Sequence, residues 1–229
     1  MLYHKIQILE KSFQALPQFV QEHSERVGRY TQILIGQMAQ LQKTGCFSEL
    51  FIPDQEKIKI LGRYHDIGKL GITDEIWNSS DPLSKTEKNF VHIHPIIGAY
   101  IVKDKLAPFD QEYSGRDISE ILMQCCLFHH ENWNGTGYPF GLKKEQIPVF
   151  ARIVRITDAY DAMTADRPYR KRISSQAALR EIETNAGRQF DPDFAEIFCS
   201  AMQSNGIVRE EYAGKEKHSR DAEQLIQHI

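Results

Sequence analysis

Residues 53–69, PDQEKIKILGRYHDIGK, combine a helical repeat of apolar residues with an adjacent histidine and aspartate. Ile58, Leu61 and His65 lie three and four positions apart, which is the spacing of one face of an α-helix. Asp54 precedes the repeat and is predicted to cap its first turn. The pattern therefore predicts a helix that points His65 inward.

The same helical spacing recurs along most of the chain, whereas the alternating pattern of a strand is scarce. The fold is therefore predicted to be all-α. Further helices are predicted over residues 1–16 and after Pro17, where an apolar face runs from Val20 to Leu41. Another is predicted to begin at the capping box Ser84–Glu87 and to end at His94 and Pro95, and the next to begin after that proline. The last two are predicted from Asp117 onward and over residues 149–165.

Glycine and proline interrupt residues 131–148, ENWNGTGYPFGLKKEQIP, so this segment is predicted to be an irregular loop. Residues 206–229 are polar and charged, and are predicted to form an exposed helix or tail. We find no internal repeat or low-complexity linker. We therefore expect one domain over residues 17–205, preceded by the short helix 1–16.

Composition narrows the class of protein. With 229 residues and 41% hydrophobic content, the chain is long enough to bury a core. A formal charge of -3 lacks the basic excess typical of duplex-binding proteins, so we expect no duplex nucleic acid partner. The four cysteines form no CxxC pair and are expected to be reduced core thiols. No membrane span or signal peptide is apparent, so a cytoplasmic protein is expected.

Five of the nine histidines fall at inward or loop-edge positions: His23, His65, His94, His129 and His130. A lone histidine on an apolar helix face is usually a satisfied core or surface residue. The adjacent pairs His65-Asp66 and His129-His130 differ, because burying two polar groups together is costly without a common partner. Asp158 lies on the apolar face of its helix, where an unpaired carboxylate is also costly. The alternative is a set of unrelated salt bridges and caps.

A mixed set of imidazoles and carboxylates suits iron, manganese or zinc better than calcium or magnesium. The number of ligands is sufficient for two metal ions, and Asp66 could bridge them with one oxygen each. Such a pair generates a water-derived nucleophile near neutral pH and holds phosphate oxygens, which suits attack on a phosphodiester.

Two segments carry a specific resemblance to a known family. His65-Asp66-Ile67-Gly68-Lys69 resembles the HDxGK signature of the HD-GYP family, and residues 129–139, HHENWNGTGYP, resemble its HHExxxGxGYP signature. Matching segments follow in the family's order: GLK at 141–143, DAYDAMT at 158–164, RPYR at 167–170 and QFDP at 189–192. The resemblance covers residues 17–205. It implies an HD-type helical bundle and a metal-dependent phosphodiesterase that hydrolyses cyclic di-GMP, or a related cyclic dinucleotide, to the linear product and sometimes to GMP.

The resemblance also assigns roles to individual residues. It implies seven metal ligands: His23, His65, Asp66, His94, His129, His130 and Asp158. Lys69 would hold a substrate phosphate oxygen and steady transition-state charge, and would act in catalysis beside Asp66. Arg167 and Arg170 would contact the nucleotide phosphates, and Tyr138 would present its ring and hydroxyl to the pocket. The alternatives are that Lys69 is merely solvated, that Arg167 and Arg170 form a salt-bridged turn, and that the glycines around Tyr138 form an ordinary tight turn.

Several positions depart from the family's pattern. Asn134 stands where aspartate is usual, so one hydrogen bond behind the metal ligands or in the loop is expected to differ, and Asn78-Ser79-Ser80 lacks a common lysine. On one helix His92 and His94 would point about 200° apart, so only His94 is expected to face the site. A third metal would need a glutamate four residues before His23, where Phe19 stands, so we expect two ions, iron or manganese.

Three functions remain open at this stage. The first is the phosphodiesterase, regulated by substrate level, by the helix 1–16, by a separate protein or through a homodimer, since little chain is left for a sensor domain. The second is a cyclic dinucleotide receptor that acts through protein contacts, although such members usually lose ligands. The third is an HD hydrolase of nucleoside triphosphates or guanosine alarmones, against which the segment around Tyr138 argues.

Overall fold

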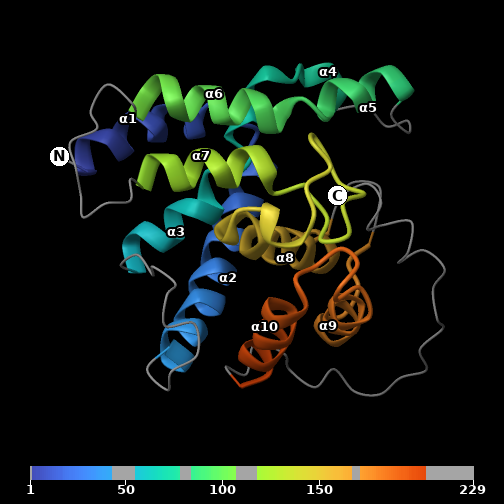
Figure 1. Ribbon diagram of the computed structural model, residues 1–229. Coiled ribbons are helices and arrows are strands. Elements are labelled where there is room, and N and C mark those ends of the chain that lie inside the picture. The colour runs from blue at the N-terminus through green and yellow to red at the C-terminus, as the bar shows by residue number, and fades with distance from the viewer. Residues whose placement is uncertain (1, 43–54, 78–83, 107–117, 167–170, 205–229) are drawn as a thin grey trace.

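The computed structural model describes residues 2–42, 55–77, 84–106, 118–166 and 171–204, and within these ranges the chain is a bundle of helices (Figure 1). No strand occurs in the described ranges, where the sole bridge joins Ala186 and Phe190. The all-α prediction is confirmed. The elements are α1 (Leu2–Gln14), α2 (Gln18–Gln42), α3 (Gln55–Arg63), η1 (Ile67–Gly71), α4 (Asp74–Trp77), α5 (Lys85–Val91), α6 (His94–Leu106), α7 (Ile118–Phe128), η3 (Lys144–Gln146), α8 (Val149–Thr164), α9 (Ser175–Thr184) and α10 (Pro192–Ser204).

The helices form two groups that meet at α2 and α8. Helices α6 and α7 lie side by side with α1 behind them, and α9 and α10 lie at the opposite end (Figure 1). Helix α8 packs against α7 as well as α9 and α10, so it reaches both groups, and α2 packs against α3, α8 and α10. One apolar core runs through the bundle, and it includes Leu34, Tyr64, Ile153 and Phe198, all fully buried.

The helix predicted before the histidine and aspartate pair is α3. Ile58 and Leu61 on its predicted face are fully buried, and so is His65. Close contact with α2 depends on glycine, because a Cβ on Gly62 would lie 2.7 Å from the hydroxyl of Thr31. Asp54, the predicted cap, lies outside the described residues.

The junction between α5 and α6 corrects one predicted boundary. The capping box at Ser84 is present, since its hydroxyl accepts from the Glu87 amide while Glu87 accepts from the Ser84 amide. The helix that it opens was expected to continue to His94, but α5 ends at Val91 and His94 begins α6. Pro95 thus lies in the first turn of α6, where its missing N–H is not needed.

Other predicted segments have mixed outcomes. The loop over residues 131–148 is irregular apart from η3, and α8 matches the helix predicted over 149–165 to within one residue. Cys125, Cys126 and Cys199 are free and buried, as expected. Among the described helices, none is long and apolar enough to cross a membrane. Cys46, the cap at Asp117, the segment 78–80 and the tail 206–229 lie outside the described residues.

Candidate metal centre

Seven polar side chains from five parts of the chain converge in the interior of the bundle. His23 comes from α2, His65 and Asp66 from the turn after α3, His94 from the start of α6, His129 and His130 from the end of α7, and Asp158 from α8. Each is less than 9% exposed. These are the seven residues that the sequence proposes as metal ligands, and the fold brings all of them together.

A glycine allows the two ends of this cluster to approach. A Cβ on Gly68 would lie 1.9 Å from the carbonyl oxygen of His94 and 2.4 Å from the amide nitrogen of Gly98. Only a residue without a side chain permits η1 to lie directly on the start of α6. The contact places Asp66, just before η1, beside His94.

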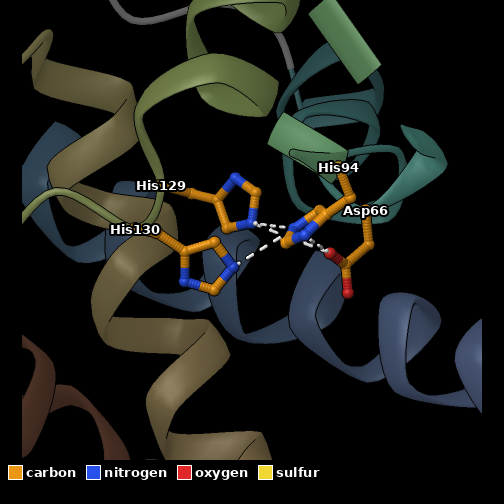
Figure 2. Close-up of side chains that lie close together, drawn as sticks. All are labelled: Asp66, His94, His129 and His130. Atoms are coloured by element: carbon orange, nitrogen blue, oxygen red, sulfur yellow. Dashed lines mark hydrogen bonds and ion pairs between the residues drawn. The ribbon is translucent and has the colours of Figure 1, made fainter. Parts of the chain in front are cut away.

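We call His94, His129 and His130 the imidazole half of the cluster. Figure 2 shows their rings turned toward one another, with Asp66 approaching His94 from the other side. The His94 Nε2 atom lies 3.3 Å from His129 Nε2 and 3.2 Å from His130 Nε2. The Nδ1 atoms of His94 and His129 lie within 3.0 Å of backbone carbonyl oxygens, of Val91 for the first and of Cys125 and Cys126 for the second.

We call His23, His65 and Asp158 the carboxylate half. The Asp158 Oδ1 atom lies 3.1 Å from His23 Nε2 and 3.8 Å from His65 Nε2. His65 Nδ1 donates to the Gly62 carbonyl at 2.6 Å. His23 Nδ1 lies 2.7 Å from Asp161 Oδ2, and this carboxylate also accepts two hydrogen bonds from Arg26.

Asp66 belongs to both halves. Its Oδ1 atom lies 3.2 Å from His94 Nε2 and 3.7 Å from His129 Nε2, in the imidazole half. Its Oδ2 atom lies 3.4 Å from His65 Nε2 and 3.5 Å from His23 Nε2, in the carboxylate half. Lys69 donates a short hydrogen bond to the same Oδ2 atom. The two oxygens of one buried carboxylate thus face two different sets of nitrogens.

The halves differ in how they hold protons. Burial opposes charge on His23 and His65, but the carboxylates of Asp158 and Asp66 that face both rings, with Asp161 at His23, raise their pKa values to about 10 and about 9. Burial instead lowers the pKa of His129 to about 4 and that of His130 well below its usual range. Burial would raise the pKa values of Asp66 and Asp158, yet the cations and imidazoles around them hold both well below the usual range.

The donor set fits a metal ion. A carbonyl oxygen only accepts hydrogen bonds, so Nδ1 of His65, His94 and His129 carries the proton and, in the neutral ring, Nε2 presents a lone pair. In the imidazole half such lone pairs point at one another. His65 Nε2 and Asp66 Oδ1 are buried without a hydrogen-bond partner. A cation would coordinate all of these atoms. Histidines whose Nδ1 atom donates a hydrogen bond to a backbone carbonyl are typical of metal ligands.

Comparison with known proteins agrees with this arrangement. A model of the HD domain family matches residues 11–194. This chain belongs to the HD domain family. Its HDIGK and GYP segments further identify it as an HD-GYP protein, the resemblance stated above.

Curated relatives of this HD-GYP chain are phosphodiesterases by name. It is 37% identical to the cyclic di-GMP phosphodiesterase PA4108 of Pseudomonas aeruginosa over 156 residues, 67% of this chain and 35% of the relative. It is 33% identical to a cyclic di-GMP phosphodiesterase of Thermotoga maritima, over 86% of this chain and 48% of the relative. It is 31% identical to the 3'3'-cGAMP-specific phosphodiesterase 3 of Vibrio cholerae, over 87% and 38%. The chain therefore spans less than half the length of these relatives.

Solved structures support the fold. Bd1817, an HDG"Y"P protein of Bdellovibrio bacteriovorus, superposes with a TM-score of 0.55 at 21% identity, over 80% of this chain and 52% of that one. A cyclic GMP-AMP specific phosphodiesterase of Vibrio cholerae gives a TM-score of 0.52 at 21% identity, over 90% and 48%. At this identity the likeness concerns the helical HD fold alone.

The loop over residues 131–148, which carries the GYP segment of this HD-GYP chain, is folded around Glu131. The sequence alone assigned no role to this motif residue. The buried Glu131 carboxylate accepts hydrogen bonds from the amides of Phe140, Gly141 and Leu142. Gly135 has a positive φ of 81°, as expected for a loop glycine. Gly137 serves close packing instead, because a Cβ there would lie 2.4 Å from the His130 carbonyl oxygen. The loop carries Tyr138 directly onto the ring of His130.

Three further side chains support the HD-GYP centre without having been predicted. Asp161 and Arg26 hold His23 from behind. The buried Arg155 donates to the side-chain oxygen of Asn132 and so ties α8 to the loop. Asp161 could have been recognised, because it follows Asp158 by three residues and shares its helix face. The pairing of Arg155 with Asn132 has no such signal, because it joins positions far apart in sequence.

The remaining predicted residues have separate outcomes. Tyr138 lies beside the metal centre, where its ring stacks on His130. The Lys69 ammonium group contacts Asp66, and its assignment to a substrate phosphate oxygen stays a prediction. Arg167 and Arg170 lie outside the described residues. Phe19, which stands where a third metal ion would need a glutamate, is 49% exposed and offers no oxygen ligand.

Proposed function

We propose that this HD-GYP protein hydrolyses a cyclic dinucleotide, cyclic di-GMP or a close relative such as cyclic GMP-AMP, to the linear dinucleotide and in part to GMP. The observation that carries the proposal is the position of Asp66. Each of its oxygens faces a different group of imidazoles, which is the arrangement expected of a carboxylate that bridges two ions. The names of the curated relatives support the substrate class.

We propose that the centre holds two divalent ions, iron or manganese. His94, His129 and His130 would hold one, His23, His65 and Asp158 would hold the other, and Asp66 would bind both. When bound, such a pair supplies a nucleophile from water at neutral pH and offsets charge on the phosphate. The chain contributes rigid placement of the ligands, since backbone carbonyls and Asp161 hold their Nδ1 atoms.

Residues beside the ions would bind the substrate. Lys69 is partly exposed and lies at the Oδ2 edge of Asp66, where an ammonium group can move to a phosphate oxygen and stabilise its growing charge. Tyr138 lines the centre from the loop, and Arg167 and Arg170 would contact the phosphates. We propose that residues 17–205 form the catalytic domain, and that a separate protein or a second copy of the chain regulates it. Helix α1 packs against this domain through buried Leu9 and Phe13, and Leu16 in the turn after the helix is buried as well.

The test is turnover of defined substrates. Protein purified without oxygen is incubated with cyclic di-GMP, cyclic GMP-AMP and cyclic di-AMP, while products are separated by chromatography and bound metal is quantified. We expect a linear dinucleotide to form in proportion to bound iron or manganese. Tight binding without turnover, in protein with a full complement of metal, would contradict hydrolysis and identify a receptor.

A further inference from the structure

Three aromatic rings form a column beside the centre. The ring of Tyr138 stacks on the ring of His130, with centroids 4.7 Å apart and planes inclined by 15°. On its other side Tyr138 stacks on His92, with centroids 4.2 Å apart and planes inclined by 18°. The tyrosine that gives the loop its motif is therefore held between two histidines.

The two histidines reach Tyr138 from different parts of the chain. His130 follows α7 and is 7% exposed, whereas His92 is the C-cap of α5 and is exposed. The break between α5 and α6 makes the second contact available, because it lies between His92 and the ligand His94. His92 and His94 are two residues apart but have different neighbours: His94 faces the metal centre, and His92 faces the loop.

Stacking from both sides restricts the tyrosine. A ring with one covered face can tilt away from it, but a ring between two parallel planes slides only within its plane. Without His92, the partly buried Tyr138 would lose its outer cover, while the loop would keep its backbone hydrogen bonds to Glu131. The effect of His92 is therefore on ring orientation and not on the path of the loop.

We propose that His92 is a positioning residue for substrate binding: it holds Tyr138 parallel to His130, so that the tyrosine keeps one orientation beside the metal centre. The proposal rests on the proposed function, because it takes Tyr138 as a contact of the cyclic dinucleotide. Its structural part, the stack in solution, is tested independently of that function.

The first experiment tests the stack directly. Histidine-labelled protein is loaded with Zn²⁺, which is diamagnetic, and its imidazole proton signals are recorded by NMR. The His92 signal, assigned by its loss in His92→Phe, should be shifted upfield by the ring current of Tyr138. The shift should disappear in Tyr138→Leu. A His92 signal that does not respond to Tyr138→Leu would overturn the proposal, whatever the enzyme hydrolyses.

The second experiment tests the consequence for binding. His92→Ala should raise KM for the dinucleotide about three- to tenfold, the factor that corresponds to one aromatic pair, with kcat and metal content unchanged. His92→Phe should restore KM because a flat ring can stack, and His92→Leu should not. Phe90→Ala is the matched control, because it removes an exposed ring from the same short helix and should leave KM unchanged.

A double-mutant cycle separates the possible failures. In a Tyr138→Leu background, His92→Ala should cause no further rise in KM, since the residue acts through the tyrosine. An unchanged KM in His92→Ala, or an additive effect in the double variant, would overturn the positioning role while the phosphodiesterase stands. If wild-type protein turns over no cyclic dinucleotide, the proposed function fails, and the NMR result alone decides whether the column exists.

Discussion

The two halves of the metal centre contain the same number of side chains, but their buried polar atoms find partners in different ways. In the carboxylate half, His23 and His65 face Asp158 and the Oδ2 atom of Asp66. In the imidazole half, three histidines share only the Oδ1 atom of Asp66. The first half can be stabilised by protons on its histidines, and burial prevents this at His129 and His130 of the second.

The difference indicates which interactions the metal ions must supply. Without metal, the carboxylate half forms buried ion pairs between imidazolium and carboxylate, which satisfy much of its polarity. The imidazole half has converging lone pairs, and burial lowers the pKa values of His129 and His130, so that both rings stay neutral. A metal ion would therefore replace protons in one half and would fill a position without an alternative occupant in the other.

The largest effect is expected from removing the residue that the halves share. Asp66→Ala should lower turnover by more than about 10³-fold, beyond the loss of a single preorganised donor, because both of the proposed ions would lose a ligand. Metal content should fall in both halves, and metal-dependent stability should fall with it. Metal analysis and product formation are measured on the same sample. A variant with full metal content and rate would show that Asp66 is only a structural cap.

The halves should also respond differently to pH when metal is added. In the metal-free protein His23 and His65 have pKa values of about 10 and about 9, so metal must displace their protons at neutral pH. Affinity of the carboxylate half should rise by about tenfold or more per pH unit from pH 6 to 8. Burial keeps His129, with a pKa of about 4, and His130 neutral, so the imidazole half should change less. Calorimetric titration with Mn²⁺ measures both steps, and two steps with equal pH dependence would contradict the comparison.

The pH dependence of stability in the metal-free protein should show the same contrast between the halves. The pKa of His23 is raised from 6.5 to about 10, so its contribution is complete below pH 6.5 and is lost as pH rises toward 10. The pKa of His129 is lowered from 6.5 to about 4, so its burial becomes destabilising as pH falls from 6.5 toward 4. Urea denaturation across this range should show a maximum of stability near pH 6.5.

Substitution of Lys69 tests whether the cation at the edge of the carboxylate half binds the substrate phosphate or stabilises the bound metals. Lys69→Ala should leave metal content unchanged and cost about 2 to 4 kcal/mol of transition-state stabilisation, as for one preorganised donor. Arg167→Ala should behave in the same way. Lys59→Ala is the control, because Lys59 pairs with Glu25 at a partly exposed site outside the metal centre. Metal loss equal to the loss of turnover would refute the assignment of Lys69 and Arg167 to phosphate.

Asp161 should affect one half only. Asp161→Asn keeps the shape of the side chain but removes the charge that holds His23 Nδ1, so metal affinity of the carboxylate half should fall about 10- to 100-fold. The imidazole half should be unchanged. Asp191→Asn is a matched control, since it removes charge from another buried pair, with Arg152. It should lower stability without affecting either metal.

The sequence predicts the parts of this molecule that depend on local pattern. The inner face of α3, the capping box at Ser84 and helix α8 follow from spacing and capping chemistry. The boundary at His94 could not be predicted, because a proline is compatible with both the end and the first turn of a helix. The contact of His92 with Tyr138 could not be predicted either, since it depends on that boundary and on the folded loop.

The smallest effect is expected at Asn134, which lies in the loop and outside both halves. Its side-chain oxygen accepts hydrogen bonds from the amide and the hydroxyl of Thr136, at 3.1 and 2.7 Å. An aspartate oxygen accepts the same two bonds, so Asn134→Asp, which introduces the residue usual in the family, should change stability and kcat/KM by less than about 0.5 kcal/mol. Asn134→Ala removes the acceptor and should cost about 1 kcal/mol of stability. Thermal unfolding and steady-state kinetics on both variants measure the difference. A large gain of activity in Asn134→Asp would mean that the aspartate reaches the metals or the substrate, and that the two halves do not contain every carboxylate the centre can use.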